Sequence, residues 1–410
     1  MKREILIIGG GITGVTTGIV LRLLGYPTRI ACRHWLGHCD NKDQPYASDP
    51  RFASQYPAAS IIPYYVSIED EARHMQVNLR FFEALNFLGS VGVRRQRHYE
   101  VHEAPQNAES YAPAMPGYRP LPDDGSGEPG VPRRARELPI YGWSFQIHFA
   151  EMQRYRVFLT DLYLRLGGVV SRGEFLNAGS LSDLHVETII NCGGAWGPGF
   201  SGDRLPSRYV KGILVRADTG GRIPWNQTTG EVFSYKYHPV LAVYARPDGL
   251  PASVYFYPRS DCWLLGGTQF ESDDLSAEDA RFYDDVLPWK GESWQGNTVT
   301  LPQYGTEDRT VEVPAPLLTL NRDLIFTLTG ADVSALPLSA MIGYRHKRST
   351  VRLESDINGS SRVVHNYGHG GAGVTLSWSC AIRVAAMVRG DDGVTADQVI
   401  PLLIQSARRL

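Results

Sequence analysis

Glu4-Ile-Leu-Ile-Ile-Gly-Gly-Gly-Ile-Thr-Gly14 is the stretch of sequence that decides the fold. Its first five residues form a short apolar run, as expected for a buried parallel strand. The run leads into the pattern GxGxxG, after which the spacing of apolar residues becomes helical from Val15 to Leu24. Because a strand, a glycine turn and a helix follow one another, the motif predicts a dinucleotide-binding unit.

The residues around this turn do not identify the dinucleotide. Gly9, Gly11 and Gly14 permit a tight turn and let the backbone approach a pyrophosphate at the helix N-terminus; the alternative is a glycine-rich turn that binds nothing. The next expected strand, Pro27–Ala31, ends without the acid that usually contacts ribose hydroxyls. Arg33 favours NADP if it meets a 2′-phosphate, or it lies along the adenosine of another dinucleotide. The motif alone leaves FAD and NADP open.

Length and charge limit the class of protein. The 410 residues are too many for one hydrophobic core, and roughly 150 residues per domain suggest two or three domains. A net charge of -2, from 41 basic and 43 acidic residues, argues against nucleic acid or an anionic membrane as the main partner. We expect a globular, multi-domain protein without a bilayer-spanning segment.

Cysteine use and the N-terminus indicate the compartment. The five cysteines are widely spread and include no CxxC pair, so neither a disulfide framework nor a zinc site is predicted. Lys2 and Arg3 before an apolar run imitate a signal peptide, but Glu4 interrupts the basic patch and no convincing cleavage site follows. We therefore expect a reducing compartment, the cytoplasm.

A second glycine-rich turn lies near the other end of the chain. Residues 362–381 read Arg-Val-Val-His-Asn-Tyr-Gly-His-Gly-Gly-Ala-Gly-Val-Thr-Leu-Ser-Trp-Ser-Cys-Ala, which predicts a strand, a turn and a helix from Val374. Amides at the start of such a helix suit an anion or an electron-rich ring. This segment closely resembles the signature of the D-amino-acid oxidase family of flavoproteins, in which the turn wraps the flavin.

The resemblance extends along much of the chain and implies FAD as a non-covalent cofactor. Ser54–Ser60 is similar to the loop that closes over the flavin, and Ile189–Trp196 to the strand and turn that complete the dinucleotide fold. The sequence departs from the family at Cys32, where an acid is expected, which puts the family's mode of adenosine binding in question. The implied cofactor-binding residues are Gly9, Gly11, Ile12, Thr13, Gly14, Arg33, Ser54, Gln55, Ala58, Ala59, Ser60, Gly193, Trp196, Gly370, Gly371, Ala372, Gly373, Val374 and Thr375.

Arg348 is the expected ligand of a substrate carboxylate. An arginine suits this role because its guanidinium donates two parallel hydrogen bonds and keeps its charge. Alignment to the family puts Arg348 of the segment Ile342–Glu354 at the carboxylate-binding position. The alternative is that Arg345, Lys347, Arg348 and Arg352 form a solvated basic strand, in which alternation sends Lys347 to the face opposite Arg348.

Tyr255 and Gly371 complete the expected catalytic set. Tyr255–Thr268 predicts two antiparallel strands around a turn, and it resembles the family hairpin that carries a substrate-facing tyrosine. The resemblance implies that Tyr255 hydrogen-bonds the carboxylate, although in so aromatic a strand the alternative is a packing residue. It also implies that the backbone carbonyl of Gly371 accepts from the substrate amine. A second tyrosine found in some relatives falls near Pro251 here.

Other polar residues near these motifs carry weaker signals. His365 and His369 flank the second glycine turn, but no carboxylate or cysteine stands at ligand spacing, so we expect no metal site. Lys347 and Lys236 are cations that suit an acidic substrate side chain, a role for which the sequence offers no further support.

The predicted fold class is α/β, with a Rossmann-like FAD-binding domain interleaved with a mixed or antiparallel β-sheet substrate domain. We expect the FAD domain at 1–65, 141–205 and 345–410, and the substrate domain at 66–140 and 206–344. Strand-like runs in the latter are Ile213–Ala217, Val240–Tyr244 and Leu324–Leu328. The Pro/Gly-rich stretch 103–139 cannot form a helix or a central strand, so it is either a disordered surface loop or an active-site cover.

These features predict an FAD-dependent oxidase of a D-amino acid, glycine or an N-substituted glycine. Hydride transfer to flavin N5 gives an imino acid, water releases the oxo acid with ammonia or an amine, and O₂ becomes H₂O₂. The alternatives are a dehydrogenase with another electron acceptor and a flavin- or NADP-binding protein without catalysis. The expected partners are a small molecule with a free carboxylate and O₂, not nucleic acid or membrane, and a homo-oligomer is compatible with the sequence.

Overall fold

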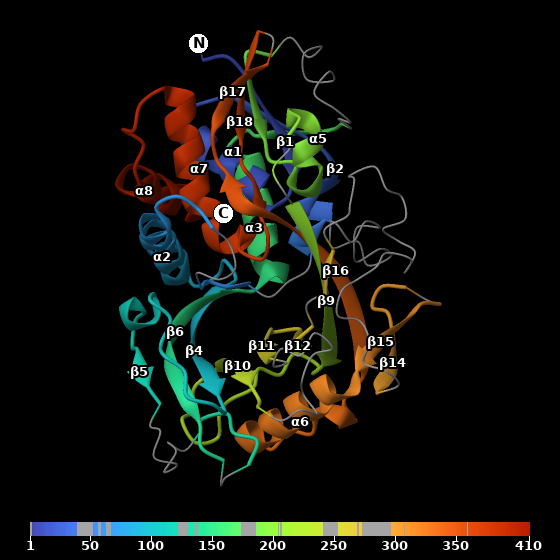
Figure 1. The fold of residues 1–410 in the computed structure, drawn as a ribbon. Coiled ribbons are helices and arrows are strands. Elements are labelled where there is room, and N and C mark those ends of the chain that lie inside the picture. Colours follow the sequence, from blue (N-terminus) through green and yellow to red (C-terminus); the bar gives the residue numbers. More distant parts are fainter. Residues whose placement is uncertain are drawn as a thin grey trace.

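The structure is a computed structural model that describes residues 2–38, 52–55, 59–62, 67–121, 130–135, 138–173, 186–203, 205, 207–240, 253–268, 270–272, 297–306, 308–358 and 360–410. Two β-sheets lie one above the other, with several helices beside the upper sheet and helix α6 (Ala315–Thr329) below the lower one (Figure 1). The long strand β16, Leu338–Arg352, extends from the lower sheet toward the upper (Figure 1). The predicted α/β fold class is confirmed.

The smaller sheet contains both of the strands that lead into glycine turns. Its order is β17-β18-β8-β1-β2-β7, and its neighbours pair in parallel except β17 and β18. The strands are β1 (Ile5–Gly10), β2 (Thr28–Trp35), β7 (Val169–Arg172), β8 (Thr188–Asn191), β17 (Ser355–Asn358) and β18 (Ser361–His365). The strand–turn–helix unit predicted at the start of the chain is confirmed by β1 and helix α1. Near the other end β18 precedes helix α7 as predicted, but a short strand, β19 (Tyr367–His369), lies between them.

Helices cover both faces of this sheet. On one face α1 (Ile12–Leu23), α3 (Met152–Arg165) and α7 (Gly373–Arg389) bury a core that includes Ile7, Val15 and Trp378. On the other face Phe200 of the short helix α5 (Gly197–Ser201) packs on Leu6 and Ile8 of β1. A strand covered on both faces needs a continuous apolar run, which explains the sequence of β1. Helices α2 (Glu71–Leu88) and α8 (Ala396–Ala407) pack beside these elements.

The larger sheet is mostly antiparallel. Its order is β19-β16-β9-β12-β11-β10-β4-β6-β3, with β13 beside β9, β5 beside β6, and β10 parallel to β4. The strands besides β16 are β3 (Ala59–Ser60), β4 (Val93–His102), β5 (Arg119–Pro120), β6 (Tyr141–Ala150), β9 (Ser207–Asp218), β10 (Phe233–His238), β11 (Val254–Pro258), β12 (Cys262–Gly266), β13 (Phe270–Ser272) and β19 (Tyr367–His369). A two-stranded sheet, β14 (Thr298–Pro302) and β15 (Thr310–Pro314), precedes α6.

Helix α6 corrects one of the strand predictions. Leu324–Leu328 lies within α6, whereas Ile213–Ala217 does lie in a strand, β9. Most of the expected strand Val240–Tyr244 lies outside the described residues. Leu317, Leu320 and Leu324 follow helical spacing and are buried against the larger sheet, so the longer pattern decides for a helix where a short apolar run is ambiguous.

Part of the Pro/Gly-rich stretch is packed rather than disordered. Ala112 and Met115 are buried against Trp143 and Phe145 of β6. Arg134 pairs with Glu103, at 2.9 Å between Nε and Oε1. The stretch is therefore packed at these residues, whereas 104–110 are exposed, and 122–129 and 136–137 lie outside the described residues.

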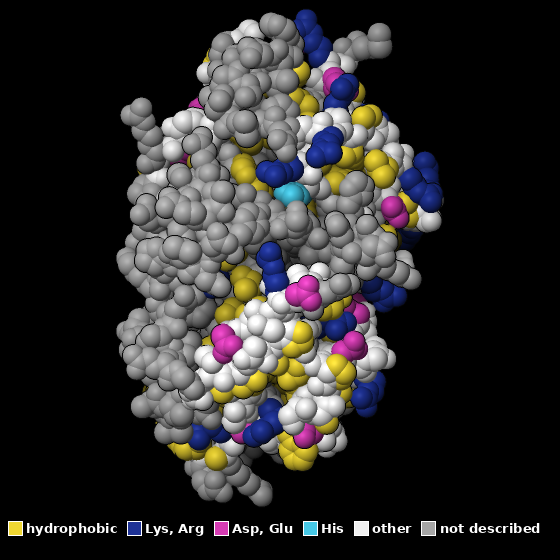
Figure 2. Space-filling model, turned by 90° about the vertical axis from the view of Figure 1, so that its right-hand side faces the viewer, with side chains coloured by type: hydrophobic (Ala, Val, Ile, Leu, Met, Phe, Trp, Pro, Cys, Tyr) yellow, Lys and Arg dark blue, Asp and Glu magenta, His cyan; other side chains and the backbone are white. Residues whose placement is uncertain are grey.

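The division into two discontinuous domains stays a prediction, although several strands lie in a different sheet from the one expected. Strand β6, assigned by sequence to the FAD domain, pairs with β4 in the larger sheet, and the short strands β3 and β19 belong to that sheet too. No described helix is both long and apolar enough to cross a membrane. The face of the molecule shown in Figure 2 carries scattered basic, acidic and hydrophobic side chains.

Candidate active site

A first cavity, with a volume of about 180 Å³, lies between the two glycine-rich turns. Its walls include residues that follow or end β1, β2 and β8, three parallel strands of the smaller sheet. Ligands of open α/β sheets bind at the carboxyl ends of such strands. The sequence-predicted residues in its wall are Gly9, Gly11, Ile12, Thr13, Arg33, Ser54, Gly193, Trp196, Gly370 and Gly373.

The first glycine turn keeps its backbone at this cavity because side chains do not fit. Gly9 has a φ of 108°, and a Cβ there would collide with the carbonyl oxygen of Cys192. A Cβ on Gly14 would collide with the carbonyl oxygen of Gly9, so Gly14 lets α1 pack closely on β1. Helix α1 then begins at Ile12, whose amide donates to Oγ of Ser54 at 3.0 Å. The positive end of α1 therefore lies at the cavity, as a pyrophosphate requires.

Two buried histidines in the same wall provide hydrogen-bonding atoms that the described residues leave unused. Both ring nitrogens of His346 and Nε2 of His369 have no hydrogen-bond partner among those residues. Burial lowers the pKa of each imidazole to about 4, so both rings are neutral at pH 7. Buried polar atoms are nearly always hydrogen-bonded, so these nitrogens indicate a ligand with polar edges. Together with the glycine cradle, they fit a bound FAD.

The end of β2 differs from the expected pattern in the way the sequence indicates. Cys32 is buried, and its burial raises the pKa of the thiol to about 11, so it offers no charge to a ribose. Its Sγ lies where a Cβ on Gly10 would otherwise stand. Cys32, Arg33 and His34 all line the first cavity, and the adenosine contacts must come from this wall without a carboxylate at Cys32.

A second cavity, of about 270 Å³, adjoins the first. Ile12, Ala53, Ser54, Gly370 and Gly373 line both. Helix α7 begins at Gly373, so its positive end lies at the wall that the two cavities share. The sequence-predicted residues that line the second cavity are Ser54, Ser60, Tyr255, Gly370, Gly371, Ala372, Gly373, Val374 and Thr375, with Ile12.

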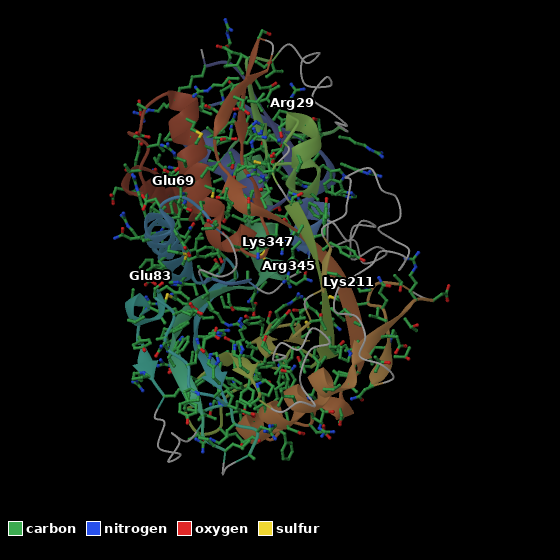
Figure 3. The ribbon with its side chains drawn as sticks, viewed as in Figure 1. Arg29, Glu69, Glu83, Lys211, Arg345 and Lys347 are labelled. Atoms are coloured by element: carbon green, nitrogen blue, oxygen red, sulfur yellow. The ribbon has the colours of Figure 1, made fainter. Side chains whose placement is uncertain are left out.

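Arg345 and Tyr255 extend into the second cavity over glycines of neighbouring strands. The Nη2 atom of Arg345 lies 3.1 Å from the position that a Cβ would take on Gly212 of β9. Tyr255 faces Gly266 across β11 and β12, and its ring occupies the space of the missing side chain. Arg345 forms no hydrogen bond or ion pair with any described residue. Figure 3 shows Arg345 and Lys347 in the middle of the molecule, between the two sheets.

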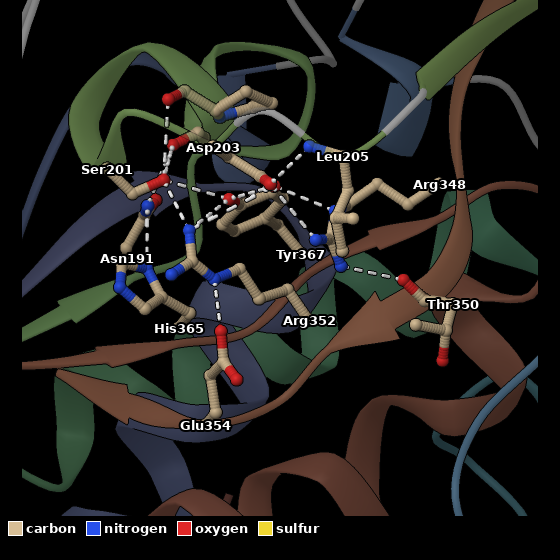
Figure 4. Close-up of polar contacts among 12 residues, drawn as sticks. Asn191, Ser201, Asp203, Leu205, Arg348, Thr350, Arg352, Glu354, His365 and Tyr367 are labelled. Atoms are coloured by element: carbon tan, nitrogen blue, oxygen red, sulfur yellow. Dashed lines mark hydrogen bonds and ion pairs between the residues drawn. The ribbon is translucent and has the colours of Figure 1, made fainter.

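The structure places Arg348 elsewhere, on the opposite face of β16. Its side chain is 3% exposed and forms an ion pair with Asp203, at 2.7 Å between Nε and Oδ2, while Nη1 donates to the carbonyl of Thr350 at 2.8 Å (Figure 4). Arg348 does not line the second cavity. Successive residues of a strand face opposite sides, so Arg345, three residues before Arg348, is the arginine of β16 that lines the second cavity. Sequence reasoning recognised the alternation but did not single out Arg345, and the role of Arg348 as carboxylate ligand stays a prediction that this placement does not favour.

The Arg348–Asp203 pair belongs to a buried network beside the second glycine turn. Asp203 also accepts a hydrogen bond from the hydroxyl of Tyr367 at 2.7 Å, and Arg352 donates to that hydroxyl at 3.1 Å (Figure 4). Burial alone would raise the pKa of Asp203, but the hydrogen bonds from Tyr367, the Leu205 amide and Arg348 hold it below its ordinary value. Because Tyr367 directly precedes Gly368, the network fixes the start of the turn.

The remaining predicted residues are placed as follows. Gln55 ends a short 3₁₀ turn and Ala59 is buried in β3, and neither lines a cavity. Ala58 lies outside the described residues. The ring of His365 contacts that of Tyr367 edge to face, and its Nε2 lies 3.2 Å from Asp356, while its Nδ1 lies 3.2 Å from the Asn191 amide. His365 thus contacts structural partners.

Comparisons with known proteins agree with this arrangement. The sequence profile of the family described as FAD dependent oxidoreductase matches residues 4–387. The chain is 28% identical to a D-amino-acid oxidase of Rubrobacter xylanophilus, over 93% of this chain and 94% of that protein. It is 26% identical to a D-amino-acid oxidase of Streptomyces coelicolor, over 94% and 96%. The crystal structure of glycine oxidase from Geobacillus kaustophilus has the same fold, with a TM-score of 0.58 at 15% identity over 96% and 97%.

The chain therefore belongs to the family of FAD-dependent oxidoreductases, because the family profile covers nearly its whole length. It is an oxidoreductase with FAD as its cofactor, which settles the choice that the first glycine motif left open between FAD and NADP. Within that family its curated relatives are D-amino-acid oxidases, so the resemblance seen in the second glycine turn is confirmed.

Proposed function

We propose that this protein oxidises the Cα–N bond of a D-amino acid or a glycine-type amine, with Arg345 as the ligand of the substrate carboxylate. The observation that carries the proposal is the second cavity, which adjoins the FAD cavity and holds a guanidinium without a partner among the described residues. A charged group left unpaired in a cavity is costly unless a ligand of opposite charge occupies it. A carboxylate matches the arginine fork in shape and charge.

Tyr255 and Gly371 complete the contacts proposed for the substrate. The phenol of Tyr255 donates to the carboxylate, and its ring is fixed over Gly266. The backbone carbonyl of Gly371, in the turn between the two cavities, accepts a hydrogen bond from the amine. These contacts hold the substrate at two points and leave Cα directed at the wall shared with the FAD cavity. Positioning of this kind supplies most of the protein's part in such a reaction.

The residues of the first cavity are proposed to hold FAD. The turn at Gly9–Gly14 receives the pyrophosphate, and His346, His369 and the start of α7 face the flavin. Bound FAD would supply the acceptor for the hydride from Cα and would return the two electrons to O₂ as H₂O₂. The protein need not supply a general base for this transfer, provided that the substrate amine is neutral, and the described lining of the second cavity contains no aspartate or glutamate. The imino acid is released and hydrolysed to the oxo acid.

An anaerobic bleaching screen tests the proposal. The purified holoprotein should be yellow, and its flavin absorbance should fall on mixing with a D-amino acid, glycine or sarcosine without O₂. Substrates that bleach the flavin should release one H₂O₂ per turnover when air is admitted. If no amine with a carboxylate bleaches the flavin, the proposed function fails. If bleaching occurs but peroxide is not formed, the protein is a dehydrogenase with another electron acceptor.

A further inference from the structure

We propose that Lys236 forms a subsite for a second carboxylate, so that the substrate is an α-amino or α-imino dicarboxylate rather than a neutral amino acid. This inference rests on the proposed function, because it assumes that the α-carboxylate binds at Arg345. Lys236 lies on β10 and lines the second cavity.

The position of Lys236 follows from the register of the larger sheet. Glu100, Lys236, Tyr255 and Gly266 are direct neighbours across the four adjacent strands β4, β10, β11 and β12. Directly opposed residues have Cβ atoms roughly 5 Å apart and share a face. The ring of Tyr255 lies over Gly266, so the lysine stem stands beside the tyrosine that we place on the substrate carboxylate.

Arg345 reaches the same cavity from the other side of Tyr255. Its guanidinium lies over Gly212 of β9, and the sheet order from there is β9, β12, β11 and β10. Tyr255 therefore stands between the two cations, Arg345 and Lys236. A substrate with its α-carboxylate at Arg345 and Tyr255 directs its side chain along the tyrosine toward the flexible Lys236 side chain.

The charge of the cavity wall supports an anionic substrate group beyond the α-carboxylate. Lys236, Arg345 and Lys347 all line it, whereas no aspartate or glutamate does so among the residues that the structure describes. Placed inside a partly closed cavity, these cations attract a second anion more strongly than surface charges would, even with Glu100 beside Lys236.

Glu100 lies beside Lys236 on the neighbouring strand β4, where its carboxylate stabilises the lysine charge, and it does not line the second cavity. The carboxylate is 1% exposed, and its Oε1 lies 3.1 Å from Nε2 of His98. Burial would raise the pKa of Glu100, but nearby His238, whose Nε2 lies 3.8 Å from Oε2, the hydrogen bond with His98 and the charge of Lys236 hold it well below its ordinary value. Glu100 is therefore ionised and lies beside Lys236 on the neighbouring strand.

A metal ion is the competing explanation for this corner of the sheet. Glu100, His102 and His238 have ligand atoms within 4.8 Å of one another. However, the rings of His102 and His238 are stacked, with centroids 4.1 Å apart and planes 6° from parallel. A metal lies in the plane of each imidazole that binds it, so two parallel stacked rings cannot both direct a lone pair at one ion without rotating. Lys236, already beside Glu100, also supplies the positive charge that an ion would otherwise provide.

Substrate pairs that differ only in charge test the subsite. The three pairs are D-glutamate and D-glutamine, D-aspartate and D-asparagine, and iminodiacetate and sarcosine. In whichever pair the wild-type holoprotein accepts, we expect a higher kcat/KM for the dicarboxylate, which is named first. In the variant Lys236→Met the ratio of the two kcat/KM values should fall about 10- to 100-fold, as expected for one charge-assisted hydrogen bond. Lys236→Arg should restore most of the ratio.

Lys347→Met is the matched control, because it removes a different cation from the same cavity wall. In this variant the ratio of the two kcat/KM values should stay within about threefold of the wild-type ratio. Binding of glutarate and of butyrate, followed by perturbation of the flavin absorbance, gives a second readout that does not depend on turnover. Glutarate binding should weaken in Lys236→Met by the same 10- to 100-fold, and butyrate binding should change less.

The outcomes separate this inference from the proposed function. If the wild type oxidises only neutral amino acids, or if Lys236→Met lowers both members of a pair equally, the subsite is overturned while the oxidase proposal stands. If Lys347→Met changes the ratio and Lys236→Met does not, the second carboxylate binds elsewhere and the assignment of Lys236 is wrong. If no amine bleaches the flavin, the proposed function itself has failed.

Discussion

Two arginines of one strand, Arg345 and Arg348, lie three residues apart and have opposite surroundings. Arg348 is buried and paired, with an ion pair to Asp203 and hydrogen bonds from Nη2 to Asp203 and from Nη1 to the Thr350 carbonyl. Arg345 is partly exposed in a cavity and has no partner among the described residues. The guanidinium of Arg348 has the environment of a structural ion pair. That of Arg345 lines a cavity with its donors available, as the proposed carboxylate ligand requires.

The difference shows that the charged partners around a side chain indicate its role better than its residue type does. Both side chains are arginines next to a glycine-rich turn, and an alignment displaced by three residues exchanges them. Arg348, whose guanidinium is held by Asp203 and the Thr350 carbonyl, has few hydrogen-bond donors left for a substrate. Arg345 lies over Gly212 at the second cavity and has no partner among the described residues, so its guanidinium keeps all of its hydrogen-bond donors for a ligand. Exchanging or removing the two guanidinium groups should therefore have effects of different kinds.

The largest effect is expected on stability, from Arg348→Met. It should lower the free energy of unfolding by about 3–5 kcal/mol, because the Asp203 side chain would remain buried without the nearest of its cations. Urea unfolding of the holoprotein measures this. As the control, the double variant Arg348→Met, Asp203→Leu should regain much of the loss, since both charges are then removed. If the single variant is as stable as the wild type, the pair is not the structural element described here.

The next effect is expected on catalysis, from Arg345→Met. It should lower kcat/KM for the amine that best bleaches the wild-type flavin by about 10²- to 10³-fold, because the carboxylate loses its bidentate partner. Steady-state kinetics and the FAD content of the purified variant are the measurements. The FAD content and the urea midpoint should stay near the wild-type values. If Arg348→Met keeps its flavin but loses carboxylate binding, and Arg345→Met does not, then Arg348 is the carboxylate ligand and the proposed role of Arg345 is wrong.

The smallest effect concerns pH and His346, which lies on the face of Arg348. Burial, and then the charge of Arg348, lower the folded-state pKa of His346 from 6.5 to about 4. Between these pH values the unfolded chain binds more protons, so folding stability falls as the pH falls from about 6.5 toward 4. From pH 7 to pH 5 this histidine should account for about 1–2 kcal/mol of lost stability.

Comparison of urea unfolding for wild type and His346→Asn at both pH values isolates this contribution. The background from His102, His365 and His369, whose pKa values are also lowered to about 4, cancels in the difference between the two proteins. An equal loss of stability in wild type and variant would show that His346 is not held neutral by its surroundings.

Local signals predicted the parts of this fold that depend on neighbouring residues. The turn after β1, the helix α7 and the hairpin of β11 and β12 were all predicted, because glycine positions and apolar spacing act within one segment. Leu324–Leu328 was misassigned because five apolar residues fit a strand or a helix, and only the partners of α6 decide. The packing of Ala112 and Met115 depends likewise on β6, a distant strand in the sequence.

The site was harder to predict than the fold, since its residues meet through sheet pairing. The neighbours of Tyr255 are Lys236 and Gly266, and both contacts follow from a register that turns and packing set. Alternation separated Lys347 from Arg348 correctly, but it could not show which face looks into the cavity. The partner of Arg348, Asp203, lies 145 residues away and carries no motif.

The length of β16 has a consequence for how this protein can be altered. One strand carries His346 to the FAD cavity on one face and Arg345 to the second cavity on the other, and the whole length of β9 supports it. The distance between the FAD cavity and the guanidinium proposed to bind the substrate is thus set within one strand. Redesign for a new side chain should leave β16 untouched and vary β10 and β11, because those strands can change which molecule is accepted without moving the point where it reacts.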